Sequence, residues 1–259
     1  TNMFGLNNAL SYNALVSRLE EVREVMVTKP GSMFIDELDS FILRVKLFGL
    51  HFATLDIRQD SSIHEKVMQA VNEKFKVSAV PYAEWSHEQK VEFLTTSTIE
   101  VWEDDFTDPL VKDTFKTIRA MKEIQGHNGE KACNRYIISN STSACSVLEV
   151  LAMFKFCGYR DAAISVDIIP LFETIEGLDT AKDSMEELYN NLAYRRHLNI
   201  RKNTQTIMLG FSDGTKDGGY IKANWEIFRA KERLTQVSEE NEVSVIFFDG
   251  RGGPPARGG

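Results

Sequence analysis

The sequence predicts a helix-rich α/β protein whose parallel strands form part of a (β/α)8, TIM-type barrel. Five short runs rich in β-branched and aromatic residues alternate with longer amphipathic stretches. Most of these runs are apolar almost throughout, which is typical of strands buried on both faces of a parallel sheet. No GxGxxG motif follows the first run, which disfavours a dinucleotide-binding, doubly wound sheet. We expect about five of the eight strands of a barrel.

The predicted strands are bounded by polar or glycine residues, and the connections between them are long enough to hold helices, as βαβ units require. They are His51–Ile57, Arg135–Ser139, Ala163–Phe172, Thr206–Phe211 and Val243–Phe248.

Apolar residues at helical spacing predict helices before, between and after these strands. The predicted helices are Tyr12–Val27, Ile35–Leu47, Ser143–Phe156, Asp179–Leu198 and Lys222–Val237. The stretch Ser61–Phe75 and the connector Trp85–Ile124 are expected to be mostly helical with breaks. We treat residues 1–259 as a single incomplete catalytic barrel domain, with a helical lead-in over residues 1–50 and a helical connector over about 61–130.

Composition excludes several classes of protein. Apolar residues make up 42% and charged residues 26% of the 259 residues, which excludes collagen-like, coiled-coil and wholly disordered chains. The formal net charge of −8 argues against a nucleic-acid partner. No apolar run is long enough to span a bilayer and no signal peptide is present, so we expect no membrane partner and a cytoplasmic location.

The cysteines and histidines predict no catalytic group of their own. Cys133, Cys145 and Cys157 form no CxxC pair, and we interpret them as buried thiols in a reducing compartment. No GxSxG motif occurs. His51 opens the first predicted strand, and the other four histidines are expected at the surface: His64, His87, His127 and His197. We therefore expect any general base to lie outside this chain.

The two ends suggest a piece of a longer protein. The chain begins with Thr1 rather than methionine, and it stops in a glycine- and arginine-rich stretch that directly follows the last predicted strand. We expect this stretch to be an active-site loop within a longer polypeptide.

Polar side chains gather where the predicted strands end, which is the catalytic edge of an α/β barrel. Glu173 and Asp213 follow neighbouring strands and could share one Mg²⁺, which prefers one or two carboxylates. Four cationic side chains lie at the same edge and would form an anion pocket: Arg58, Lys216, Arg251 and Arg257.

Each of these residues also has a structural interpretation. A carboxylate before a helix is often an N-cap, which would suit Asp213. Lys216 could simply be solvated, and glycine- and arginine-rich loops are often flexible. These residues indicate a functional site only when they are taken together, because acidic and basic side chains recur at the same edge of the sheet after four strands.

At these strand ends the sequence resembles phosphoenolpyruvate carboxylase. The resembling segments are VKLFGLHFATLDIRQ at 45–59, PLFET at 170–174, MLGFSDGTKDGG at 208–219 and FDGRGGPPARGG at 248–259. The last two match the family's signature segments, which read approximately GYSDSxKDAG and FHGRGGxxxRGG. The resemblance covers nearly the whole chain and implies the central part of the catalytic barrel.

The resemblance also implies ligands and roles. The family uses Mg²⁺ or Mn²⁺, and Glu173 and Asp213 match its metal ligands. Its arginines contact the phosphoryl group or carboxyphosphate, and one of them also holds an aspartate-type inhibitor. The matching residues are Arg58 and Arg251 for the substrate, Arg257 for the substrate and inhibitor, and Lys216 as a residue lining the site.

One position departs from the family pattern. Many members have histidine before GRGG, and that histidine assists carboxylation, whereas this chain has Asp249. An aspartate supplies no cationic donor at neutral pH. Either this branch of the family works differently, or Asp249 pairs with a neighbouring arginine or lysine.

The resemblance implies an activity for the longer protein. The family carboxylates phosphoenolpyruvate with bicarbonate to oxaloacetate and phosphate, through carboxyphosphate and a metal-bound enolate, and so replenishes the tricarboxylic acid cycle. Its members are commonly homotetramers. We expect the 259-residue chain by itself to be inactive, because the family's catalytic histidine segment and later strands are absent. The alternatives are another Mg²⁺-dependent phosphoenolpyruvate/pyruvate-type barrel enzyme and a non-catalytic anion-binding scaffold.

Overall fold

The structure is a computed structural model that describes residues 11–29, 33–159 and 164–250. The chain divides into two compact units, one within Thr1–Leu55 and Glu123–Cys133, the other within Asp56–Lys122 and Asn134–Gly259. No described helix is both long enough and apolar enough to cross a membrane.

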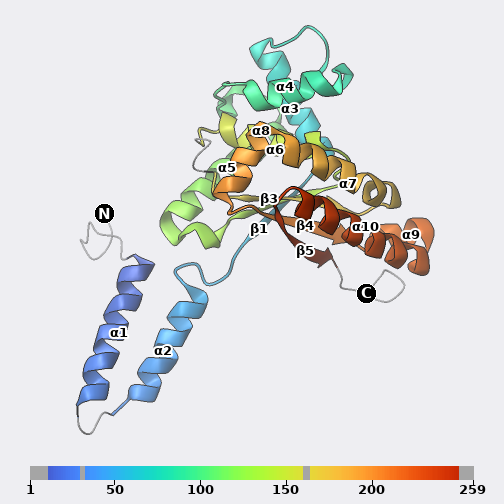
Figure 1. Cartoon of the computed structure of the whole chain (residues 1–259). Coiled ribbons are helices and arrows are strands. Elements are labelled where there is room, and N and C mark those ends of the chain that lie inside the picture. The colour runs from blue at the N-terminus through green and yellow to red at the C-terminus, as the bar shows by residue number, and fades with distance from the viewer. Residues whose placement is uncertain (1–10, 30–32, 160–163, 251–259) are drawn as a thin grey trace. The chain divides into compact units, whose positions relative to one another are not determined.

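The first unit contains a pair of helices, α1 (Tyr12–Thr28) and α2 (Ile35–Phe48), which pack side by side (Figure 1). Ser11 caps α1, since its hydroxyl accepts a hydrogen bond from the Ala14 amide. The guanidinium of Arg23 forms a bidentate ion pair with Asp39 of α2, with N–O distances of 2.5 Å and 3.0 Å. This solvent-exposed ion pair links α1 to α2.

The second unit is built on a five-stranded sheet in which every neighbouring pair is parallel. The strands follow one another in space in the order in which they occur in the sequence. They are β1 (Asp56–Asp60), β2 (Arg135–Ser139), β3 (Asp167–Phe172), β4 (Thr204–Gly210) and β5 (Ser244–Gly250). Because all five run in one direction, their carboxyl ends form a single edge of the sheet.

Helices connect and cover the strands, and α6, α7 and α10 lie along the sheet in sequence order (Figure 1). The α-helices are α3 (Ser61–Phe75), α4 (His87–Thr96), α5 (Pro109–Asn128), α6 (Ala144–Phe156), α7 (Ile175–Asn190), α8 (Leu192–Ile200), α9 (Ser212–Gly218) and α10 (Tyr220–Glu240). Short 3-10 turns are η1 (Tyr82–Glu84), η2 (Glu103–Asp105) and η3 (Glu130–Ala132).

Helix α6 is the centre of the core. Most of its residues are apolar, and all but one of its residues are buried, including Ser146 and Glu149. It contacts α3, α4, α7 and β3. The ring of Phe154 meets Tyr136 of β2 edge-on, with 5.9 Å between ring centroids. A helix without a polar face is stable only when it is covered on all sides, which explains why α4 lies over it.

The sequence predicts most of these elements, but it misplaces the first strand. The prediction was His51–Ile57, whereas β1 is Asp56–Asp60. The apolar residues before β1 form a turn in which Phe52 adopts a positive φ of 62° and its ring stacks on Phe48, with centroids 5.1 Å apart. The apolar pattern that resembled a strand thus belongs to a turn in which Phe52 and Leu55 are largely exposed.

Two helical predictions also needed correction. The single helix predicted at Asp179–Leu198 is two helices, because the Asn191 side chain accepts from the amides of Ala193 and Tyr194 and starts α8. The glycine-rich stretch after β4, which carried no predicted helix, forms the short helix α9.

The expected surface position of two histidines is wrong. His64 and His197 are buried, and His64 Nε2 lies 3.0 Å from the Tyr136 hydroxyl. Burial lowers the pKa of each imidazole to about 4, so both rings are neutral at physiological pH. The prediction that the three cysteines are buried is confirmed, and none of them forms a disulfide.

Glu149 of α6 is a buried carboxyl group, and the Tyr82 hydroxyl donates to its Oε1 at 2.9 Å. Burial raises the pKa of Glu149 to about 8. The group is therefore mostly protonated in the folded chain at neutral pH, whereas its ordinary pKa of 4.5 leaves it ionised in the unfolded chain.

We predict that Glu149→Gln stabilises the chain increasingly as pH rises from 4.5 to 8. Between these pH values the Glu149 carboxyl group releases its proton mainly in the unfolded wild-type chain, so the free energy of unfolding of the wild type falls as pH rises. The glutamine side chain of the variant does not titrate, so it adds no such pH dependence. The difference in free energy of unfolding between variant and wild type should grow by about 3 kcal/mol from pH 4.5 to pH 7. Urea titrations across this range measure it.

The matched control is Glu239→Gln, at an exposed position near the end of α10. Its stability curve should run parallel to that of the wild type. A constant offset between Glu149→Gln and wild type at every pH would contradict the prediction.

Candidate functional site

Glu173 occupies the centre of the sheet edge and follows β3 directly. Its side chain is 16% exposed, and its two oxygens have different partners. Oε1 accepts the backbone amide of Asn140 at 2.9 Å, and Oε2 lies 3.5 Å from the Arg58 guanidinium. Asn140, directly after β2, has a φ of 54°. A carboxylate with one fixed donor and one cation is held in a single orientation.

Gly210, the last residue of β4, lies directly beside Glu173. A Cβ atom on Gly210 would lie 2.5 Å from Glu173 Cβ and 3.0 Å from its Cα. No side chain fits at that distance, so glycine is required for the two strand ends to come this close. The register confirms the placement, because Phe172 pairs with Leu209 one residue earlier on each strand.

Asp213 lies in the first turn of α9, three residues after Gly210. The neighbouring Gly214 would place a Cβ 3.6 Å from the Glu173 carbonyl oxygen, so this turn packs on the Glu173 backbone. Asp213 is inside the helix rather than at its N-cap, which is Phe211. The N-cap interpretation of Asp213 is therefore wrong.

Lys216 is not simply solvated, since its ammonium lies 2.5 Å from Asp213 Oδ1. Both side chains are about half exposed, at 57% and 42%. Beside them the Ser212 hydroxyl is buried and has no hydrogen-bond partner among the described residues. A buried hydroxyl without a partner next to a carboxylate leaves an oxygen ligand and a donor available.

The arrangement suits a hard divalent cation that keeps water or substrate ligands. The described residues contain no group of three or more His, Cys, Asp or Glu side chains that could enclose a metal ion. Mg²⁺ is commonly held by one or two carboxylates and oxygens of water and phosphate, which is what Glu173 and Asp213 can offer. The donor set therefore fits Mg²⁺ or Mn²⁺ better than a structural zinc ion.

Arg58 reaches Glu173 from an unexpected position. It lies in the middle of β1, opposite Ile137 of β2, and not in a loop after the strand. Its guanidinium is half exposed. A long side chain that starts within an edge strand can lie along the sheet edge, and this brings Arg58 to Glu173.

Comparison with known proteins shows the family of the chain. The sequence matches the family described as phosphoenolpyruvate carboxylase over residues 6–259. The chain belongs to the phosphoenolpyruvate carboxylase family. A phosphoenolpyruvate carboxylase of Gloeobacter violaceus is 37% identical over 235 residues, covering 86% of this chain and 24% of the relative.

Other relatives give the same picture. The phosphoenolpyruvate carboxylase of Nitrosomonas europaea is 38% identical, covering 82% of this chain and 24% of that protein. The one from a Synechococcus species is 34% identical, covering 96% of this chain and 24% of that protein. The chain thus spans about a quarter of the length of the curated phosphoenolpyruvate carboxylases it matches.

Asp249, where many phosphoenolpyruvate carboxylases have histidine, forms an ion pair with Lys231 of α10, with 2.7 Å between Nζ and Oδ1. Of the two alternatives raised by the sequence, the structure thus shows pairing with a neighbouring lysine. Asp249 lies within β5 and pairs with Leu209 of β4, so it is part of the sheet and not of the loop after it. Arg251 and Arg257 lie outside the described residues.

Three residues of the site were not predicted from the sequence. Asn140 carried no signal beyond a formal glycosylation sequon, and its contribution is a backbone amide. Gly210 precedes the SDG motif but bears no functional group. Lys231 lies in a charged helix face, eighteen residues before its partner Asp249. Backbone donors and close approaches leave little trace in a single sequence.

We predict that Gly210→Ala destabilises the chain by about 2 kcal/mol or more, because the new methyl group must displace Glu173. Thermal or urea unfolding measures the loss. The control is Gly126→Ala in α5, where a Cβ meets nothing within 4 Å and alanine should stabilise the helix by up to about 1 kcal/mol. Equal effects of the two substitutions would show that the approach of β4 to Glu173 is looser than described.

A second prediction concerns Lys231 and Asp249. A double-mutant cycle with Lys231→Met and Asp249→Asn should give a coupling free energy of about 1 kcal/mol, because both groups are about two-thirds buried. The Lys112–Asp104 pair, whose carboxylate is 96% exposed, should give a smaller value in the same experiment. If the two pairs couple equally, Asp249 is not held by Lys231 in solution.

Proposed function

We propose that this chain supplies the metal- and phosphate-binding edge of a phosphoenolpyruvate carboxylase. The observation that carries the proposal is the approach of Gly210 to Glu173, with 2.5 Å between Glu173 Cβ and a Cβ placed on the glycine. This approach brings the strand that leads to Asp213 against the strand that leads to Glu173. Family membership supports the assignment of substrates, which are phosphoenolpyruvate and bicarbonate.

The proposed reaction divides into two steps. An oxygen of bicarbonate attacks the phosphorus of phosphoenolpyruvate, and the bond from phosphorus to the enol oxygen breaks, which leaves carboxyphosphate and the enolate of pyruvate. Carboxyphosphate then releases phosphate and CO₂, and the enolate carbon attacks the CO₂ to give oxaloacetate. A bound Mg²⁺ or Mn²⁺ would supply positive charge that offsets the negative charge on the enolate oxygen.

Residues of this chain hold and orient the reacting groups. Glu173 and Asp213 are the proposed metal ligands, and the Asn140 amide keeps the Glu173 carboxylate in place. Lys216 exchanges its Asp213 partner for a phosphoryl oxygen when that carboxylate serves as a ligand. Arg58, half exposed beside Glu173, presents a planar guanidinium to phosphate or carboxyphosphate oxygens.

We also propose that the sheet is part of a (β/α)8 barrel. Sequential order and uniformly parallel pairing support this, because right-handed crossovers then place every helix on the same face of the sheet. Three buried cysteines that form no disulfide support a reducing, cytoplasmic location. The inhibitor role of Arg257, the substrate role of Arg251 and a homotetrameric assembly stay predictions that rest on the family resemblance.

Metal binding tests the site without requiring turnover. We predict that Glu173→Gln and Asp213→Asn each lower the affinity of the chain for Mn²⁺ at least about tenfold, since each removes one of two charged ligands. Mn²⁺ electron paramagnetic resonance and isothermal titration calorimetry measure the dissociation constant. Circular dichroism shows whether the fold of each variant is retained.

The control is Asp183→Asn, an exposed carboxylate on α7. It should leave Mn²⁺ affinity unchanged. If all three variants bind Mn²⁺ like the wild type, the carboxylate pair is not the metal site, and a non-catalytic scaffold becomes the better interpretation.

A further inference from the structure

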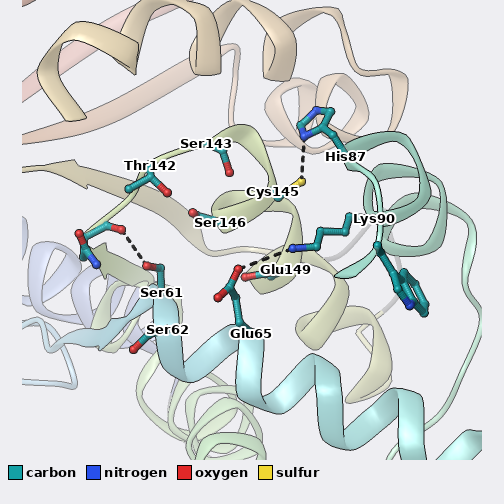
Figure 2. Close-up of a pocket in the computed structure, with 12 residues that line it drawn as sticks. Ser61, Ser62, Glu65, His87, Lys90, Thr142, Ser143, Cys145, Ser146 and Glu149 are labelled. Atoms are coloured by element: carbon teal, nitrogen blue, oxygen red, sulfur yellow. Dashed lines mark hydrogen bonds and ion pairs between the residues drawn. The ribbon is translucent and has the colours of Figure 1, made fainter. Parts of the chain in front are cut away.

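A polar cavity lies next to the loop that orients Glu173. It is lined by the N-terminal ends of α3 and α6 and by α4 (Figure 2). Its volume is about 300 Å³, which is enough for a small metabolite. Hydroxyl groups dominate its lining at the α6 end, where the side chains of Thr142, Ser143 and Ser146 lie close together (Figure 2). Lys90 of α4 adds an ammonium group on the opposite side.

Helix α6 presents an uncapped N-terminus to this cavity. Ser143 occupies the N-cap position, yet its hydroxyl makes no capping hydrogen bond. Within the described part of the chain, the amides of Ala144 and Cys145 have no acceptor. Free amides at the start of a thirteen-residue helix carry partial positive charge and point at whatever lies before the helix.

Ser146 gives an independent indication of a ligand. The residue is only 6% exposed, it lines the cavity, and its hydroxyl has no hydrogen-bond partner among the described residues. Figure 2 shows its oxygen on the same side as those of Thr142 and Ser143. The hydroxyl is open to the cavity and has no partner in the described part of the protein, so a ligand atom there can form a hydrogen bond with it.

Carboxyl groups also line the cavity. The Glu65 carboxylate lies 3.7 Å from the Lys90 ammonium, so the two side chains form an ion pair. Glu149 is held mostly protonated by a pKa of about 8, because burial disfavours its charged form. The hydroxyl groups and the free amides lie at the α6 end of the cavity.

The same lining includes a thiol, but it does not favour nucleophilic chemistry. Cys145 Sγ lies 3.6 Å from His87 Nδ1, a spacing that superficially resembles a cysteine–histidine pair. Burial raises the pKa of the Cys145 thiol to about 12, so the sulfur stays protonated. The cavity is therefore suited to holding a ligand rather than to attacking one.

We propose that this cavity binds the oxyanion group of a small metabolite, a phosphate or a carboxylate, on the free amides of Ala144 and Cys145 and the hydroxyl of Ser146. Thr142 and Ser143 add hydroxyl donors, and Lys90 is near enough to share its charge with the ligand and Glu65. This site is separate from Glu173 and Asp213.

The loop between β2 and α6 joins the cavity to the candidate active site. Asn140 lines the cavity, and its amide donates to Glu173 while its carbonyl accepts the Ser61 hydroxyl at 2.7 Å. A ligand at the start of α6 would restrain this loop and with it the donor that orients Glu173. This link rests on the proposed function of Glu173, whereas anion binding itself does not.

Calorimetric titration of the metal-free chain with inorganic phosphate and with acetate tests the site and identifies the group. We expect saturable binding of at least one anion. The anion that binds with the higher affinity identifies whether the site prefers a phosphate or a carboxylate group. Ser146→Ala should weaken that binding about tenfold, the effect of losing one hydrogen bond to a charged group. The control Ser184→Ala, on α7 and also 6% exposed, should leave the dissociation constant unchanged.

A second pair of variants and a spectroscopic readout complete the test. Lys90→Gln should weaken phosphate binding, whereas Lys182→Gln, which breaks an ion pair of the same 3.7 Å length on α7, should not. Amide resonances of Ala144 and Cys145 should shift with anion concentration. Absence of saturable binding by both anions, or equal affinities of the Ser146 and Ser184 variants, would overturn the proposal whatever the outcome of the Mn²⁺ experiment.

Discussion

The contact between Gly210 and the backbone of Glu173 is the constraint on which the candidate site depends. Neighbouring strands are usually separated in part by their side chains. Gly210 has no side chain, so the end of β4 can lie directly beside the Cα and Cβ atoms of Glu173. The turn that carries Asp213 then packs on Glu173 as well. The positions of two acidic groups from distant segments are thus set by the absence of one methyl group.

The same sheet edge serves several purposes at once. Every strand that ends there is followed by a helix or a loop that begins there, so acidic, cationic and amide groups converge without any long-range folding of loops. The loop after β2 shows the benefit, because Asn140 bonds Glu173 on one side and Ser61 of α3 on the other. The loop that orients Glu173 therefore also holds the start of α3.

Much of the fold could be predicted from the sequence, because buried parallel strands and amphipathic helices leave strong patterns. Arg135–Ser139 and Ser61–Phe75 match β2 and α3 at both ends. The first strand was misplaced because the apolar residues before it lie in a turn where Phe52 and Leu55 are largely exposed. The two buried histidines were missed because a neutral imidazole packs like an aromatic ring. In the site, Asn140 and Gly210 contribute only backbone, and Lys231 lies eighteen residues from its partner Asp249, so none of the three could be predicted.

The sequential strand order has a consequence for how the protein is made. Each strand pairs with the one that precedes it in the chain, so a newly synthesised β-α unit always finds its partner already in place. Folding can then advance from the N-terminal strand as the ribosome releases the chain, without waiting for distant segments. Each growing edge presents unpaired backbone groups until the next strand arrives, so this edge is exposed to pairing with another chain during synthesis.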